Sequence, residues 1–308
     1  MRFASKRDKR IVIGIVIACL LLSTVTALAA KKTEEEELVW PLPPEKPRIK
    51  FVKILSSSDD YASGLVIWFR KVILGEGSAE NKLDRPFSVA VNSQGRIYVT
   101  DNGKAPCVIV FDEGAEKKKV WRFGDSGRFA LVSPIDVTVN ENAKLVYVSD
   151  SILKKVAAFD FDGNFKFLLD PEVEFANPTG LAYDRVRDKL YVVDTKEHNI
   201  KVFTGDGQYL STIGKRGSAP GEFNFPSLVD LDSKGNLYVS DSMNFRVQVF
   251  DPEGNFLRTF GSVGDGPGQF SRAKGIALDS EDHVYVVDGA FNNFQIFTSD
   301  GQLLMWVG

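Results

Sequence analysis

Residues 226–261 read PSLVDLDSKGNLYVSDSMNFRVQVFDPEGNFLRTFG, and this stretch decides the fold. It contains four short runs of mainly apolar residues, which begin at Leu228, Leu237, Val247 and Phe256 and are separated by turn-forming residues. Short apolar runs broken by Gly, Asp, Asn and Ser are typical of antiparallel strands joined by tight turns. The stretch therefore predicts a four-stranded antiparallel sheet.

An aspartate that closes the second strand marks the register of a repeat. It ends the segments YVTD, YVSD, YVVD, YVSD and YVVD at Asp101, Asp150, Asp194, Asp241 and Asp288. Successive copies are 49, 44, 47 and 47 residues apart. Self-similarity at this period, with four strands per unit, is typical of a β-propeller in which each sheet is one blade. The sequence therefore predicts an all-β protein of four-stranded antiparallel blades, with five repeats visible in residues 83–308.

Several motifs in these repeats resemble the NHL-repeat family. They are PTGLAYD at 178–184, KGIALD at 274–279, GNLYVSDSMNFRVQVF at 235–250, and the PGEF and GPGQF loops. The resemblance covers roughly residues 83–308 and implies a β-propeller of the six-bladed type. Two alternatives follow from five visible repeats: a five-unit ring closed by an N-terminal strand, or an incomplete six-bladed pattern. The second is favoured, because the N-terminal strand resembles one edge of a blade rather than a whole blade. A missing blade would leave a gap or exposed edges.

Residues 1–30 have the pattern of a secretory signal peptide or membrane anchor. Five basic residues precede the apolar run 11–22, and Ala27, Ala29 and Ala30 provide small residues for cleavage. Two alternatives remain open. Residues 11–30 are long enough to span a bilayer as an uncleaved anchor, and the segment ending at Cys19 resembles a bacterial lipoprotein box. We expect export to the bacterial periplasm or cell envelope, or anchoring in the inner membrane with the propeller outside the cytoplasm.

The region between this leader and the repeats has three parts. Residues 31–47 are charged and then proline-rich, which predicts an extended linker. Residues 48–308 are expected to form the NHL-type propeller, and residues 48–55 alternate basic and apolar side chains as a strand that closes the ring would. Residues 64–74, GLVIWFRKVIL, have apolar side chains at helical spacing and predict a short helix. Tryptophan and phenylalanine beside two cations leave membrane-interface contact open as an alternative for this helix.

Charge and cysteine content limit the possible functions. Removing residues 1–30 takes away five basic residues and one acidic residue, which changes the net charge from −3 to −7. So acidic a chain is a poor match to the phosphate backbone, and we expect no nucleic-acid partner. Cys107 is the one cysteine left after such cleavage, so no internal disulfide can form. We interpret Cys107 as a small buried apolar residue.

Enzymatic signatures are scarce. His198 and His283 each stand alone in a repeat, which argues against the histidine-rich metal site of propeller lyases. Asp136 and Asp230 lie on first strands where the other repeats have different residues. Two such carboxylates could hold calcium on the axis, in partial resemblance to the site of propeller lactonases, or could simply be hydrogen-bonded. No G-x-S-x-G, P-loop or C-x-x-C-H motif is present. We expect no other cofactor, and a metal-dependent hydrolase or lyase is the alternative function.

A recognition surface is predicted where the loops before each first strand and after each second strand share one face. The strand-ending aspartates are expected to fix these loops by accepting backbone N–H groups. Aromatic, arginine and amide side chains on loops of a rigid scaffold favour binding of a protein, peptide or glycan. We expect some of the phenylalanines to be core, and Arg246 could equally bridge to an acid of a neighbouring blade. Phe225 and Asn293 are expected on the same face. The predicted binding residues are Arg128, Phe129, His198, Phe223, Met243, Asn244, Phe245, Arg246, Phe270, Arg272, Phe291 and Asn292.

Overall fold

The structure is a computed structural model that describes residues 39–41, 44, 46, 48–64, 66–67 and 81–308. The chain divides into two units, Met1–Ile54 and Leu55–Gly308, and each is described by itself. The predicted leader, residues 1–30, lies outside the described residues. So do most of the predicted linker 31–47 and most of the predicted helix 64–74. No helix among the residues that are described is both long and apolar enough to cross a membrane.

The first unit contains one short antiparallel pair of strands. Strand β1 (Val39–Trp40) pairs with β2 (Ile49–Lys50), with Val39 opposite Lys50. Within the segment 48–55, only Ile49–Lys50 form a strand, and their partner is β1 rather than a strand of the repeats. The role of this segment in closing a ring stays a prediction.

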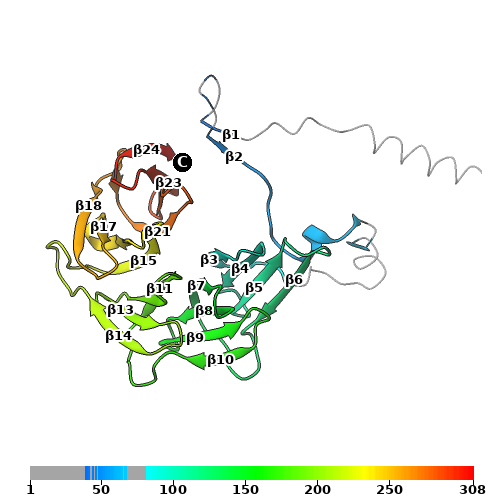
Figure 1. The fold of residues 1–308 in the computed structure, drawn as a ribbon. Coiled ribbons are helices and arrows are strands. Elements are labelled where there is room, and N and C mark those ends of the chain that lie inside the picture. The colour runs from blue at the N-terminus through cyan, green and yellow to red at the C-terminus, as the bar shows by residue number, and fades with distance from the viewer. Residues whose placement is uncertain (1–38, 42–43, 45, 47, 65, 68–80) are drawn as a thin grey trace, which may run out of the picture. The chain divides into compact units, whose positions relative to one another are not determined.

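The second unit contains five four-stranded antiparallel sheets, and each corresponds to one sequence repeat (Figure 1). Blade 1 consists of β3 (Pro86–Val91), β4 (Arg96–Asp101), β5 (Cys107–Asp112) and β6 (Lys119–Phe123). Blade 2 consists of β7 (Pro134–Asn140), β8 (Leu145–Asp150), β9 (Lys155–Asp160) and β10 (Phe165–Leu168). Blade 3 consists of β11 (Pro178–Asp184), β12 (Lys189–Asp194), β13 (Asn199–Thr204) and β14 (Tyr209–Ile213).

The last two blades follow the same order. Blade 4 consists of β15 (Pro226–Leu231), β16 (Leu237–Asp241), β17 (Arg246–Phe250) and β18 (Phe256–Phe260), with the 3-10 helix η2 (Ser242–Asn244) after β16. Blade 5 consists of β21 (Ala273–Leu278), β22 (Val284–Asp288), β23 (Asn293–Phe297) and β24 (Leu303–Val307). Two-residue strands β19 (Ser262–Val263) and β20 (Gln269–Phe270) pair in parallel between these blades, and the 3-10 helix η1 (Ser58–Tyr61) precedes blade 1. The predicted all-β propeller architecture is confirmed.

The first strand of each blade lies innermost, and these strands pack side by side in sequence order (Figure 1). Strand β3 contacts β7, β7 contacts β11, β11 contacts β15, and β15 contacts β21. Strands β21 and β3, at the two ends of this series, are not packed against each other in the same way. Five blades are thus stacked face to face around the inner strands.

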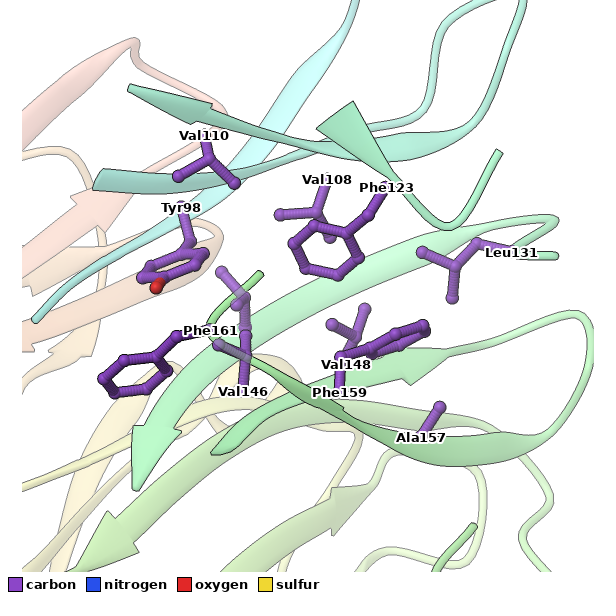
Figure 2. Packing of buried hydrophobic residues seen from close by; sticks show 11 residues of the cluster. Tyr98, Val108, Val110, Phe123, Leu131, Val146, Val148, Ala157, Phe159 and Phe161 are labelled. Carbon is purple, nitrogen blue, oxygen red and sulfur yellow. The ribbon is translucent and has the colours of Figure 1, made fainter. Parts of the chain in front are cut away.

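The core lies between consecutive blades. Figure 2 shows Tyr98 of blade 1 near Phe161 of blade 2, and Val108 and Phe123 of blade 1 facing Val148 and Phe159 of blade 2, with the rest of this buried cluster around them. Each side of an internal blade is therefore apolar, which explains why the strands of the repeat carry apolar side chains on both faces. Burial of both faces holds neighbouring sheets together through the hydrophobic effect.

Tight turns join the strands within a blade. In blade 4, the Asp232 carboxylate accepts the backbone N–H groups of Lys234 at 2.9 Å and Asn236 at 2.8 Å. Gly235 lies between them with a φ of +84°, a conformation that glycine adopts without steric cost. The aspartate and glycine of the repeat therefore fix the turn that was predicted from sequence.

Candidate binding face

The strand pairing puts two sets of loops at one end of the blades. In blade 4, Pro226 at the start of β15 is opposite Asp241 at the end of β16. The same pairing joins Pro134 with Asp150 and Pro178 with Asp194. The loops that enter β7, β11, β15 and β21 and the loops that leave β8, β12, β16 and β22 consequently share an end, which we call the loop face.

The strand-ending aspartates tie the two sets of loops together. Asp150 is buried, and its carboxylate accepts the N–H groups of Val132 at 2.7 Å and Ser133 at 2.9 Å from the entering loop. It also accepts the N–H groups of Ile152 at 3.1 Å and Leu153 at 2.9 Å from the leaving loop. Asp101, Asp194, Asp241 and Asp288 also accept backbone N–H groups from the loops. For Asp288, these hydrogen bonds hold the pKa below its usual value against the opposing effect of burial.

Three predicted binding residues are buried instead. Phe223 and Phe270 are fully buried and belong to the clusters between blades, so their interpretation as surface residues is corrected. Each comes from an entering loop that turns back so that its aromatic ring fills the space between two sheets. His198 is also buried. Its Nδ1 accepts the N–H of Phe225 at 3.0 Å, and its ring packs edge-on against the Phe225 ring.

Arg246 and Asn244 donate hydrogen bonds to the loop that enters β15. The Arg246 Nε donates to Asp241 at 2.9 Å, and its Nη2 donates to the carbonyls of Ala219 and Glu222 at 3.0 and 2.9 Å. The Asn244 Nδ2 donates to Asp241 at 2.8 Å and to the carbonyl of Gly217 at 2.9 Å. Arg246 therefore pairs with an acid of its own blade, and the expected alternative of an acid in a neighbouring blade is corrected.

The remaining predicted residues reach the surface to different degrees. Phe245 is half-buried and has a left-handed backbone conformation after η2. Phe129 is also half-buried. Its ring stacks on the Phe165 ring, with the two ring centroids 5.2 Å apart, and the Arg128 guanidinium lies over the same Phe165 ring. Arg128 and Phe129 line a cavity of about 480 Å³. The exposed members of the predicted set are Arg128, Met243, Arg272, Phe291 and Asn292.

Sequence reasoning missed some exposed apolar side chains of the loop face, among them Ile152 and Val132. Ile152 is 65% exposed, and Val132 is also exposed. Phe225, which was expected on this face, is exposed as well. Ile152 and Met243 occupy equivalent places, two residues after the strand-ending aspartate, where blade 3 has Lys196. A comparison of the repeats at that position could have found Ile152. With Met243 and Phe291, these residues give the loop face several exposed apolar side chains.

Asp136 and Asp230 connect the innermost strands. Asp136 Oδ2 accepts the N–H of Leu181 in blade 3 at 2.7 Å, and its Oδ1 accepts the N–H of Val137 and the hydroxyl of Ser88 in blade 1. Asp230 makes the matching contact between blades 4 and 5, two interfaces later, where its Oδ2 accepts the N–H of Leu278 at 2.7 Å. Burial raises the pKa of each carboxyl to about 6, although these hydrogen bonds oppose that shift.

These contacts give both carboxylates a structural role, because they occupy N–H groups on the open edge of the next inner strand. Within the part of the chain that the structure describes, no group of three or more His, Cys, Asp or Glu side chains is placed to hold a metal ion. Cys107 is buried in blade 1, and burial raises the pKa of its thiol to about 12, which keeps it protonated and unreactive.

Comparisons with known proteins agree with this architecture. A family model described as a 6-bladed beta-propeller matches residues 174–237 and 231–303. The chain has the β-propeller fold. The NHL name itself stays a prediction, and no curated protein sequence gives a significant match.

Solved structures share the propeller fold at low sequence identity. The virginiamycin B lyase from Staphylococcus aureus has a TM-score of 0.54 and 16% identity, over 71% of this chain and 69% of the lyase. A chain of a nidogen/laminin complex has a TM-score of 0.57 and 19% identity, over 72% of this chain and 79% of that chain. A functionally unknown protein from Desulfotomaculum acetoxidans has a TM-score of 0.52 and 16% identity, over 76% and 73% of the two chains. Both an enzyme and a component of a binding complex thus use this fold, which by itself selects neither function.

Proposed function

We propose that this protein is a non-catalytic binding scaffold whose loop face recognises a protein or peptide of the bacterial cell envelope. The observation that carries the proposal is the exposure of Ile152, Met243 and Phe291 on loops held by buried aspartates. Exposed apolar side chains on a well-anchored framework are typical of recognition surfaces, because the framework loses little conformational freedom on binding.

The chemistry of the loop face favours a partner with apolar side chains. Phe225 is 41% exposed and sits on the buried His198, so its ring is held in place before any partner arrives. Arg128 and Arg272 add exposed cations at the same end. An apolar peptide segment flanked by acidic residues would match both features, and this combination favours a protein or peptide over a glycan.

The alternative of a metal-dependent hydrolase or lyase has less support. Both of its candidate ligands, Asp136 and Asp230, accept backbone N–H groups from the next blade, and a metal would have to compete with these bonds. The acidic charge likewise disfavours nucleic acid. The envelope location rests on the pattern of residues 1–30, and membrane contact through residues 11–30 or 64–74 is part of the same proposal.

Selection of a random phage-displayed peptide library against the full chain tests the proposal. We expect enriched peptides with apolar and acidic residues, and at least about a tenfold loss of affinity, or about 1.4 kcal/mol, for the Met243→Asp, Phe291→Asp double variant. A matched control is Val186→Asp, because Val186 is exposed in the turn at the other end of blade 3.

Unchanged binding of the enriched peptides to the double variant would contradict the loop-face proposal. Loss of binding in Asp230→Asn, with the loop-face variant unaffected, would instead favour a site on the axis.

A further inference from the structure

The two ends of the blade series each leave a blade-packing face open. Register places Val89, Val137, Leu181, Val229 and Ile276 at the same position of the five innermost strands. In blades 2 to 5, which follow another blade, this side chain is between 3% and 8% exposed. In blade 1 the equivalent Val89 is 60% exposed, and Val91, two residues on, is 60% exposed as well. We call this surface of blade 1 its front face.

The opposite side of blade 5, its back face, shows the complementary difference. Four equivalent tyrosines on the second strands, Tyr98, Tyr147, Tyr191 and Tyr238, are at most 1% exposed because a following blade covers them. The fifth, Tyr285, is only half-buried. Val287 is 45% exposed, whereas Ser240 at the equivalent place in blade 4 is fully buried. Phe294, Met305 and Val307 share this face with them and are also only half-buried.

Polar contacts distinguish the open ends in the same way. The residues just before and after the strand-ending aspartate donate to carbonyls at the start of the next innermost strand. These bonds run from Thr100 to Ile135, from Asn102 to Pro134, from Ser149 to Thr179, from Thr195 to Pro226 and from Ser242 to Ala273. Blade 5 has Val287 and Gly289 at these two places, and neither can donate through its side chain. Across the described residues, no side chain donates to the carbonyls of Pro86 or Phe87 in β3.

Only the inner part of the front face is open. The outer part is covered by Leu55 and Tyr61, which pack on the cluster of Phe111, and the Tyr61 ring meets Phe111 edge-on at 6.4 Å. The uncovered residues, Val89 and Val91, lie on the innermost strand, where the other blades make their closest contacts. Because Val89 and Val91 are two residues apart in a strand, their side chains lie on the same side of the sheet. Such an apolar surface suits packing against another sheet rather than against a helix.

We propose that the back face of blade 5 and the front face of blade 1 together receive one further antiparallel sheet of the blade type. Its two faces are apolar, and its second strand ends in Ser or Thr, then Asp, then a hydrogen-bonding residue that donates to the Pro86 and Phe87 carbonyls. The match of residues 174–303 to a family described as six-bladed supports this occupant, because one such sheet brings the five blades to six.

The test compares the full chain with a longer chain in which a copy of residues 215–261 follows Gly308. Gly308 corresponds to Gly261, and the copy carries the required sequence Ser240-Asp241-Ser242. We expect the longer chain to melt at a higher temperature and to give lower fluorescence with the apolar probe anilinonaphthalene sulfonate. Val89→Asp should lower the melting temperature of the longer chain by about 4 °C or more, and that of the 308-residue chain by much less.

Two matched controls separate packing from general destabilisation. Val186→Asp changes another exposed valine, which lies away from both faces, and should have the same small effect in both chains. A longer chain whose copy carries Val and Gly in place of the two serines, as blade 5 does, should gain less stability.

Equal effects of Val89→Asp in the two chains would overturn the proposal. So would self-association of the 308-residue chain that Val89→Asp abolishes, because the open faces would then bind a second copy.

Discussion

At the residue scale, the buried aspartates organise the loop face. Asp241 is fully buried, and its Oδ2 accepts hydrogen bonds from Asn244, Arg246 and Gln248. Replacing Asp241 with Ala leaves the largely buried Arg246 guanidinium without its counter-charge. We expect a loss of about 3 kcal/mol or more in the free energy of unfolding, as for other broken buried ion pairs. Urea denaturation of the full chain measures it.

The control for this prediction is Asp265→Ala, because Asp265 is exposed in the loop before β21 and has no comparable partners. Its substitution should change stability by less than about 0.5 kcal/mol. If both variants are equally stable, the strand-ending aspartates do not anchor the loops.

The buried carboxyls of Asp136 and Asp230 predict that folding stability depends on pH with the opposite sign to that expected for an ordinary surface acid. Their pKa rises from 3.8 when unfolded to about 6 when folded, because burial disfavours the charged form. Between pH 4 and 6 the folded state therefore binds more protons than the unfolded state, and its stability falls as pH rises through this window. The contribution is up to about 3 kcal/mol per carboxyl.

The Asp230→Asn variant separates the contribution of the Asp230 carboxyl to stability from the contributions of the other acidic groups. We expect the stability difference, parent minus variant, to decrease as pH rises from 4 to 6 and to be constant above 7. The variant Asp265→Asn should show no such trend. A difference that increases over the same window would mean that the folded protein stabilises the charged form of Asp230.

At the scale of elements, the spacing of the innermost strands depends on glycine. A Cβ atom on Gly180 of β11 would lie 2.6 Å from the Leu228 Cα and 2.9 Å from the Ser227 carbonyl oxygen of β15. These are backbone atoms of the next blade, so the two strands would have to separate. Gly180→Ala should cost about 1–3 kcal/mol, measured by urea denaturation.

Gly275→Ala is the matched control in β21, which no later blade contacts among the described residues. Its Cβ would meet only the Val287 side chain, at 3.2 Å. We expect a clearly smaller loss than for Gly180→Ala. Equal losses would show that contact with the following blade does not decide the cost.

The sequence predicts the blades well because their signals are local. Four apolar runs and an aspartate at the end of each second strand are repeated five times, and a turn glycine such as Gly235 recurs in blade 1 as Gly95. Each of these signals follows from backbone chemistry. The candidate site is predicted less well. Phe223 and Phe291 both occupy loops, yet one fills a gap between blades and the other is exposed. That difference depends on how the loop folds back against a neighbouring sheet, which no local pattern contains.

At the scale of the whole molecule, contacts between blades account for the residues that differ among repeats. Asp136 and Asp230 stood out in the sequence as exceptions on the inner strands, and the structure places each at an interface where it accepts an N–H from the next blade. An unusual acid in a repeat protein can thus serve the joint between two repeats. This explanation competes directly with a metal site on the axis.

Thermal unfolding of the full chain in EDTA and then in calcium decides between these two roles. We expect the melting temperature to stay within about 1 °C, because calcium would have to displace the hydrogen bonds from Leu181 and Leu278. A real site occupied at a hundred times its dissociation constant would stabilise the fold by about 2.7 kcal/mol and raise the midpoint by several degrees. Such a rise, lost in Asp136→Asn but kept in Asp265→Asn, would favour the metal-dependent enzyme over the scaffold.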